Sequence, residues 1–282
     1  MPKQTFTYLF SRLNVLPHAS PRDRERFLAD GLSGPSVEAR GALWGFVDIE
    51  KLVVEGDTYL AGALVRYLPE GEEKTVDEQA HATTAALLAN EVDAESLFFL
   101  SVDTMIVAFH PVPSKIPQRT FRERFAKLFR AAHGDFFVDV ELALIQEELA
   151  IWRALQEFDK ILSFKVRLHP ANPRTTDLWE DIQRDLEEKR AEEYLEEYRT
   201  SKQSAGLNIR DDREIRGKIA MAEDGYGEAS VTGLTEGKTK VASTQRYPQT
   251  AEVSKFETKP GRILGVLVEK FSEIMHRGEP SD

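Results

Sequence analysis

The segment from Ile161 to Arg199 constrains the fold more than any other part of the chain. Polar and apolar residues alternate from Ser163 to Leu168, which predicts a strand with one buried and one exposed face. Pro170 and Pro173 end this strand, because each forces the preceding residue into extended geometry. The acidic segment that follows has apolar residues at helical spacing and predicts a long charged helix over Asp177–Arg199.

Both kinds of pattern recur along the chain. Strands are expected at Thr5–Leu16, Ala42–Val54, Thr58–Tyr67 and Phe136–Leu144, and hairpins at Leu97–Phe109 and Tyr226–Thr244. Helices are expected at Arg24–Ala29, Thr120–Ala132, Gln146–Phe158, Arg213–Glu223 and Gly261–Met275. We predict an α+β fold with mixed or antiparallel sheet layers, packed helices and one long charged helix after a central strand. Residues 1–110 form the expected β-rich region and residues 111–282 the α+β region, and the two can form one intimate unit.

Composition excludes several classes of protein. Hydrophobic residues make up 41% of the 282 residues, enough for a core, and the formal net charge is −11. This acidic total argues against unspecific coating of nucleic acid and leaves room for a local basic patch. The chain has no cysteine, which excludes disulfides and thiolate metal sites. No apolar run has membrane-spanning length, the first residues fit a strand better than a signal peptide, and we expect a cytoplasmic protein.

One segment looks like a phosphate-binding loop. Gly233 is followed by Gly237-Lys238-Thr239, as in a phosphate-binding loop. The two glycines, however, are one residue too close together for that motif. No helical pattern follows that could present its N-terminus to a phosphate. A hairpin turn at Glu236-Gly237 is therefore favoured.

A metal-dependent nuclease is an alternative that rests on two acids. Asp139 and Glu141 lie on one face of a predicted strand, where they could bind a divalent cation. A restriction-type nuclease would have a lysine where this chain has Ala143, so a solvated strand face is favoured. The six histidines are scattered, and we assign no catalytic residue, metal ligand or cofactor.

A cluster of basic residues gives the stronger signal. It lies on the predicted helix Thr120–Ala132, on the face opposite the phenylalanines, and just before that helix. Its members are Lys115, Arg119, Arg122, Arg124, Lys127 and Arg130. We expect this cluster to bind a phosphate backbone, although a solvated face that balances an acidic protein remains an alternative. Further candidate nucleic-acid-binding residues are Arg174, Lys238, Lys240 and Arg246.

Several segments occur in a characteristic order: Phe98–Phe109, the Ile161 strand, the Pro170–Pro173 corner, the charged helix, Gly206–Asn208, Gly225–Ala229, and Ser243-Thr244 before Pro248. In this order, over most of its length, the chain resembles an uncharacterised bacterial family catalogued as domain of unknown function 4747. This chain has His169 where an arginine is usual. More distantly, the layout is similar to the phage-exclusion protein RexA. The resemblance implies a dimeric, non-enzymatic protein that contacts nucleic acid and is encoded near prophages or defence islands.

Three hypotheses follow from these observations. The first is a homo-oligomeric, non-enzymatic component of a phage-defence or prophage-exclusion system. Its partners would be nucleic acid, with DNA favoured over RNA, and a second defence protein. The second is the nuclease that uses Asp139 and Glu141. The third is an adaptor whose amphipathic C-terminal helix docks a partner.

Overall fold

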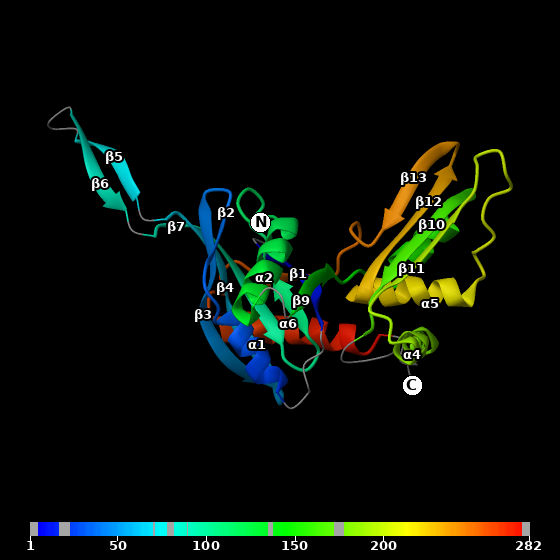
Figure 1. The fold of residues 1–282 in the computed structure, drawn as a ribbon, viewed down its shortest axis with the longest axis horizontal. Helices are drawn as coiled ribbons and strands as arrows, with labels where there is room; N and C mark the ends of the chain where they lie inside the picture. The colour runs from blue at the N-terminus through cyan, green and yellow to red at the C-terminus, as the bar shows by residue number, and fades with distance from the viewer. Residues whose placement is uncertain are drawn as a thin grey trace.

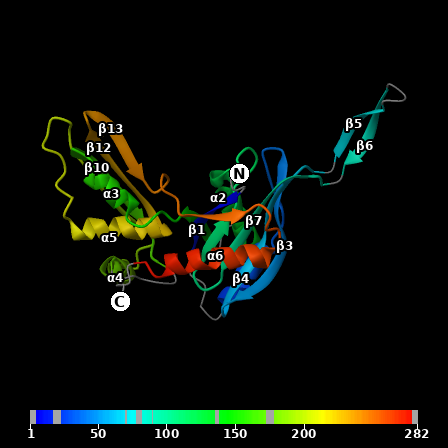
Figure 2. The same cartoon turned by 180° about the vertical axis from the view of Figure 1, so that it is seen from behind.

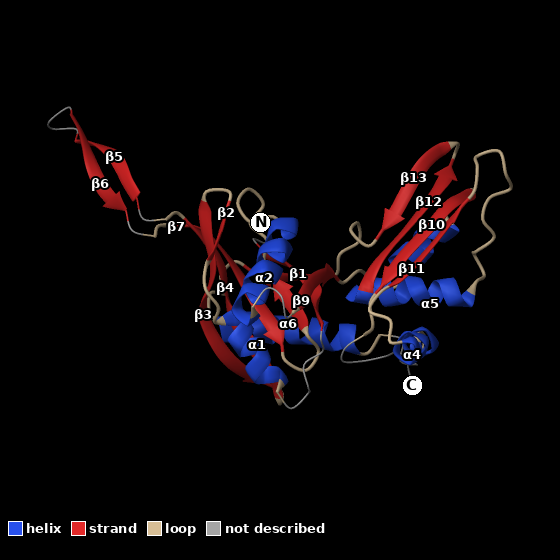
Figure 3. Cartoon of the chain, in the orientation of Figure 1, coloured by secondary structure: helices blue, strands red, loops and turns tan. Residues whose placement is uncertain are grey.

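The computed structural model describes residues 5–16, 23–69, 71–77, 82–88, 90–134, 138–171 and 178–277. In these residues the chain forms antiparallel sheets with helices packed on them (Figure 1, Figure 3). The predicted α+β class is therefore confirmed.

The larger sheet has the strand order β14-β1-β8-β7-β4-β3-β2, and β9 pairs with the same edge of β1 as β14. Its strands are β1 (Thr5–Leu16), β2 (Val37–Ala39), β3 (Ala42–Val54), β4 (Asp57–Tyr67), β7 (Val92–Ser101), β8 (Ile106–Phe109), β9 (Asp139–Leu144) and β14 (Thr250–Ser254). Helices cover both of its faces. α1 (Arg24–Leu32) and α2 (Gln118–His133) pack on one face, and α6 (Pro260–Met275) packs on the other (Figure 2). We call this assembly the large-sheet body.

Apolar side chains hold these layers together. Phe121, Phe125 and Phe129 of α2 are buried at helical spacing against strand residues that include Phe98. On the opposite face, Leu264 and Phe271 of α6 pack on aromatic residues of the sheet. Burial of each such side chain contributes roughly 1.5–3 kcal/mol. The apolar face of the C-terminal helix is thus occupied within the chain, so a partner could use it only by displacing the sheet.

The smaller sheet has the order β11-β10-β12-β13. Its strands are β10 (Lys160–Leu168), β11 (Tyr194–Arg199), β12 (Gly227–Thr235) and β13 (Lys238–Ser243). One face is covered by α3 (Ala150–Gln156), α4 (Glu180–Lys189) and α5 (Arg213–Met221), and a π-helical turn, η1 (Ala222–Tyr226), leads from α5 into β12. We call this assembly the small-sheet body.

A separate hairpin extends from the large-sheet body. β5 (Gly71–Asp77) and β6 (Ala82–Leu88) pair only with each other, and Figure 1 shows them projecting from the end of β7. This hairpin was not predicted from the sequence, because the acidic segment between Glu70 and Glu95 shows no alternation typical of a half-buried strand.

The prediction of one long helix over Asp177–Arg199 is wrong. Its described part forms α4, which ends at Lys189, where Arg190 adopts a left-handed conformation (φ 53°), and the strand β11 follows. Tyr194 and Tyr198 are four residues apart, a spacing that also suits a helix. In the structure this segment is instead a strand whose side chains alternate between the two faces of the sheet. It pairs with β10, and Tyr194 lies opposite Leu168 and packs against the core. Tertiary pairing therefore overrides the helical pattern.

Two smaller predictions also need correction. The helix expected at Thr120–Ala132 begins two residues earlier, at Gln118 after Pro117, and its first acid, Glu123, pairs with Arg119. The helix expected at Gln146–Phe158 is shorter, since residues before Ala150 belong to a connection between the two bodies. The predicted strands at Thr5–Leu16 and around Ile161, both hairpin turns and the C-terminal helix are confirmed.

The hydrophobic clusters join segments that are distant in the sequence. The large-sheet body buries residues from Leu9 to Leu144 together with α6, whereas the small-sheet core runs from Ile151 to Ala242. Packing thus unites parts of both expected regions, and whether residues 1–110 fold as a unit stays a prediction.

We expect Gly227→Ala to destabilise the protein. Gly227 has φ 153°, and a Cβ atom there would lie 2.0 Å from the backbone oxygen of Arg167. Such a contact should lower the free energy of unfolding by about 2–4 kcal/mol in urea titrations. Gly265→Ala is the matched control, because that site on α6 has open space. It should stabilise by about 0.5–1 kcal/mol, and equal effects of the two changes would contradict this account.

Candidate functional site: a cationic cleft and the joint beside it

The joint between the two bodies is built around the turn η1. Two segments of the chain connect the bodies, and they lie side by side because the Gln249 N–H donates to Ile145 O at 2.8 Å. The Gln146 N–H donates to Glu223 O at 2.8 Å, so the first of these segments also contacts η1. Gly225 has φ 86°, and a Cβ atom there would lie 2.6 Å from Arg12 Cβ. Glycine is therefore required where the small-sheet body meets β1.

Asp224 is the charged centre of this joint. Its carboxylate accepts from Arg277 Nη1 at 3.3 Å and from Trp179 Nε1 at 3.2 Å, and its backbone oxygen accepts from Arg12 Nε at 3.1 Å. Asp224 is 8% exposed, and Arg12 and Arg277 are similarly buried. Burial raises the pKa of Asp224, whereas both arginines act to lower it. The arginines belong to the large-sheet body, so these buried charges fasten one body to the other.

Glu223 lies next to Asp224 and caps a helix. Its Oε1 accepts from the Ile151 N–H at 2.6 Å, in the first turn of α3. Oε2 makes no hydrogen bond in the described part of the chain, and the residue is 1% exposed. Burial raises the pKa of Glu223 to about 8, with Asp224 as a further cause.

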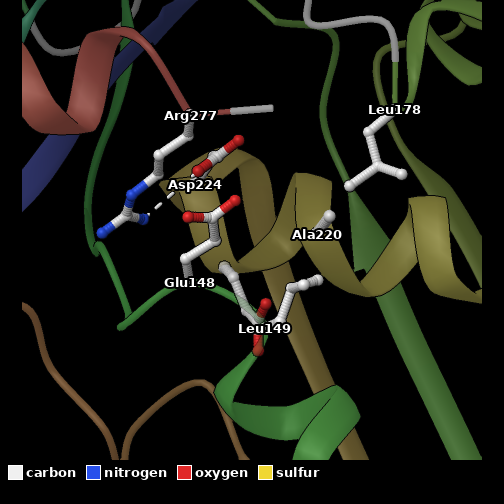
Figure 4. A pocket seen from close by; sticks show the side chains of 7 residues that line it. Glu148, Leu149, Leu178, Ala220, Asp224 and Arg277 are labelled. Carbon is white, nitrogen blue, oxygen red and sulfur yellow. Dashed lines mark hydrogen bonds and ion pairs between the residues drawn. The ribbon is translucent and has the colours of Figure 1, made fainter. Parts of the chain in front are cut away.

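A small cavity adjoins these acids. Its volume is about 10 Å³, close to the least that admits one water molecule. Figure 4 shows Glu148, Asp224 and Arg277 at one end of it, and Leu178 on the far side of Ala220. A space of this size does not suit an organic substrate, so the joint is a structural feature rather than a substrate pocket.

A much larger cleft, of about 750 Å³, lies between the two bodies. One wall is the polar face of α2, the floor includes β9, and Glu228 of β12 and Gln245 come from the small-sheet body. The basic residues lining it are Arg119, Arg122, Arg124, Lys127 and Arg130, and its acids are Glu123, Glu141 and Glu228. The sequence prediction thus identified one wall, and the acids across the cleft reduce its positive charge.

Carboxylates pair with several members of the basic cluster. Arg119 Nε lies 2.7 Å from Glu123 Oε1, and Arg130 Nη1 lies 3.7 Å from Asp139 Oδ1. Arg124 lies over the Trp44 ring at 5.6 Å, and Lys127 Nζ donates to the backbone oxygen of Glu38 at 3.4 Å. Among the described residues, these last two have no carboxylate within 4.0 Å.

The floor of the cleft carries a mixed charge cluster. Glu141 Oε2 lies 3.5 Å from His169 Nε2, and Glu141 Oε1 lies 3.5 Å from Arg167 Nη2. The close imidazole of His169 and the charge of Arg167 lower the pKa of Glu141, and the same carboxylate raises the pKa of His169. Arg122 also reaches this floor, donating to Leu142 O at 3.2 Å, and burial lowers its pKa.

The remaining predicted site residues lie elsewhere. Lys115 precedes α2 and pairs with Asp93 at 2.5 Å. Lys238 and Lys240 lie on β13 next to the turn at Gly237, whose tip points away from α2 in Figure 1. Arg246 is exposed beside Gln245, and Arg174 lies outside the described residues. Gly233–Thr239 forms the expected hairpin turn.

The described residues give the nuclease hypothesis no metal site. Among them, no group of three histidine, aspartate or glutamate side chains is placed to hold a metal ion. Asp139 is 80% exposed and pairs with Arg130, and Glu141 pairs with His169 and Arg167. A metal-dependent nuclease therefore stays a prediction.

The residues of the joint were not predicted from the sequence. Arg12, Glu223, Asp224 and Arg277 come from three distant segments, so no local motif could unite them. One signal was present: Glu223-Asp224 stands between apolar Met221-Ala222 and Gly225-Tyr226, an unusual setting for two adjacent acids.

Fold and site together define an α+β protein with a cationic cleft between two sheet-based bodies. A family model described as Domain of unknown function (DUF4747) matches residues 39–269. Since this match spans well over half of the 282 residues, the chain belongs to that family. A search among curated proteins gives no match. The similarity to RexA stays a prediction. Within the described residues, no helix is both long and apolar enough to cross a membrane.

We expect Glu223→Gln to flatten the dependence of stability on pH. A raised pKa means that the folded state holds a proton that the unfolded state releases between about pH 4.5 and about pH 8. Wild-type stability from this group is complete below that window and is lost as pH rises through it, by at most about 1.4 kcal/mol per pH unit. Urea titrations across the window would measure this, and equal slopes for both proteins would contradict it.

Proposed function

We propose that this protein is a non-enzymatic nucleic-acid-binding protein that holds a phosphate backbone in the cleft between α2 and the small-sheet body. The observation that supports this most is the arrangement of five basic side chains along one wall of a single cleft. Several arginine and lysine side chains on one wall can contact successive phosphates of a polynucleotide.

The ion pairs within the cleft are weak enough to be exchanged. The side chains of Arg119 and Glu123 are 83% and 48% exposed, and the Arg130–Asp139 pair is long and exposed. Exposed pairs contribute about 0–1 kcal/mol, so a phosphate can replace the carboxylate at small cost. Arg124 and Lys127 need no exchange. The net charge of −11 would disfavour binding elsewhere on the surface and so direct a polyanion to this cleft.

The cellular role that we propose is in a bacterial phage-defence or prophage-exclusion system, as a homo-oligomer in the cytoplasm. The support for this role is the distant similarity to RexA, and the proposed binding in the cleft would give the contact with nucleic acid that such a role requires. The adaptor hypothesis gains no support from α6, whose apolar face packs on the sheet.

We expect Lys127→Glu/Arg130→Glu to weaken binding of a fluorescent oligonucleotide and to reduce its salt dependence. Each lost phosphate contact should lower the slope of log K against log salt by about 0.7 for a single strand, so the double variant should lose about 1.4. The control is Arg184→Glu/Lys189→Glu, which makes the same charge change on α4, outside the cleft.

Two results would contradict the proposal. One is no binding by the wild type at low salt. The other is equal loss of affinity in the control and the cleft variant, since that would reflect net charge alone.

The cellular role has its own test. Cells that carry the gene should reduce phage plaque number, and the cleft variant should lose this effect while the control retains it.

A further inference from the structure

The small sheet has one open face. α3, α4 and α5 pack on the face that carries Phe164 and Val231, and in the described part of the chain no helix packs on the opposite face. Views from both sides place α3 behind the sheet in Figure 1 and in front of it in Figure 2. A polar open face is ordinary in an antiparallel sheet, so its composition decides what it can do.

Strand pairing arranges the side chains of this face in rows. Lys160, Leu234 and Thr239 lie next to the hairpin turn, and three more rows follow toward the cleft. The first of these is Arg199, Ser163, Thr232 and Val241, the second is Glu197, Lys165, Ser230 and Ser243, and the third is Leu195, Arg167 and Glu228. Serine and threonine hydroxyls thus fill the centre of the face. Lysine and arginine lie beside them, together with Glu197, Glu228 and the exposed aliphatic side chains of Leu195 and Val241. The rows contain no aromatic residue.

The third row connects this face to the cleft. Glu228 lines the cleft and lies opposite Arg167 in the strand pairing, at 3.8 Å between Oε2 and Nη2. Arg167 also contacts Glu141 on the floor of the cleft. The cleft wall on α2 and the open face are therefore two parts of one continuous surface.

Cations on the open face are available to a ligand. Lys165 is exposed and has no ion-pair partner within the described residues. Arg199 pairs with Glu197, but its side chain is 75% exposed, so the pair exchanges readily. Hydroxyls and cations without aromatic platforms suit contacts to phosphate and sugar, and they do not suit base stacking.

We propose that the open face of the small sheet continues the nucleic-acid site and carries a single polynucleotide strand onward from the cleft, held by its sugar–phosphate backbone. This inference rests on the proposed function. The cleft has the size of an ordinary ligand pocket, roughly 300–1,000 Å³, and so admits one strand rather than a duplex. Four strands at about 4.8 Å spacing add a further flat track for several nucleotides.

The test compares short and long single strands, about 6 and about 16 nucleotides, of oligouridylate and oligothymidylate, by fluorescence anisotropy. With the wild type, the long strand should bind about tenfold more tightly than the short one. Lys165→Glu/Arg199→Glu should remove this advantage and leave the affinity for the short strand unchanged. Thr232→Lys should increase the advantage, which keeps the test decisive if the first variant folds poorly. Arg184→Glu/Lys189→Glu on α4 is again the control.

The outcomes separate this inference from the proposed function. If the short strand binds and depends on Lys127 and Arg130, but the long strand gains nothing or Lys165→Glu/Arg199→Glu has no effect, the extension is wrong and the cleft remains. If the short strand does not bind, or binds independently of Lys127 and Arg130, the proposed function itself fails. Tighter binding of a duplex than of either single strand would overturn the single-strand assignment.

Discussion

The buried contact between Asp224 and the arginines Arg12 and Arg277 is the interaction on which the rest of the structure depends. Asp224 belongs to the small-sheet body and the arginines to the large-sheet body, so the contact sets how the two bodies sit together. A charge at this depth is tolerated only when it is paired, and removing one partner of such a set typically costs about 3–5 kcal/mol. The joint therefore specifies one geometry, and the shape of the neighbouring cleft follows from it.

Asp224 affects the cleft through its position in the chain. The turn η1 leads directly into β12, whose first residues include Gly227 and Glu228. Glu228 lines the cleft, and Gly227 lies against the backbone of Arg167. Fixing Asp224 thus fixes the strand that faces α2. A π-helical turn is rare and often marks a functional position, and here it lets Glu223 cap α3 while Asp224 faces the arginines.

Local sequence pattern was enough to predict the helices and strands whose buried side chains recur at regular helical or strand spacing. The phenylalanines of α2, the alternation of β10 and the turn at Glu236-Gly237 were identified for this reason, and so was the basic wall of the cleft. Features that depend on distant pairing were not. Tyr194 and Tyr198 fit a helix until β10 pairs with them, and Glu141 and Glu228 reach the basic wall only when the two bodies meet. A prediction from the α2 sequence alone therefore overestimated the positive charge that a ligand in the cleft would encounter.

The most direct test of the account is lysine footprinting with an acetylating reagent, with and without a long single-stranded oligonucleotide. The account predicts that the oligonucleotide slows modification of Lys127 in the cleft and of Lys165 on the open face, and that it leaves Lys189 on α4 unaffected. Unchanged rates at Lys127 and Lys165 while the oligonucleotide is bound would contradict it.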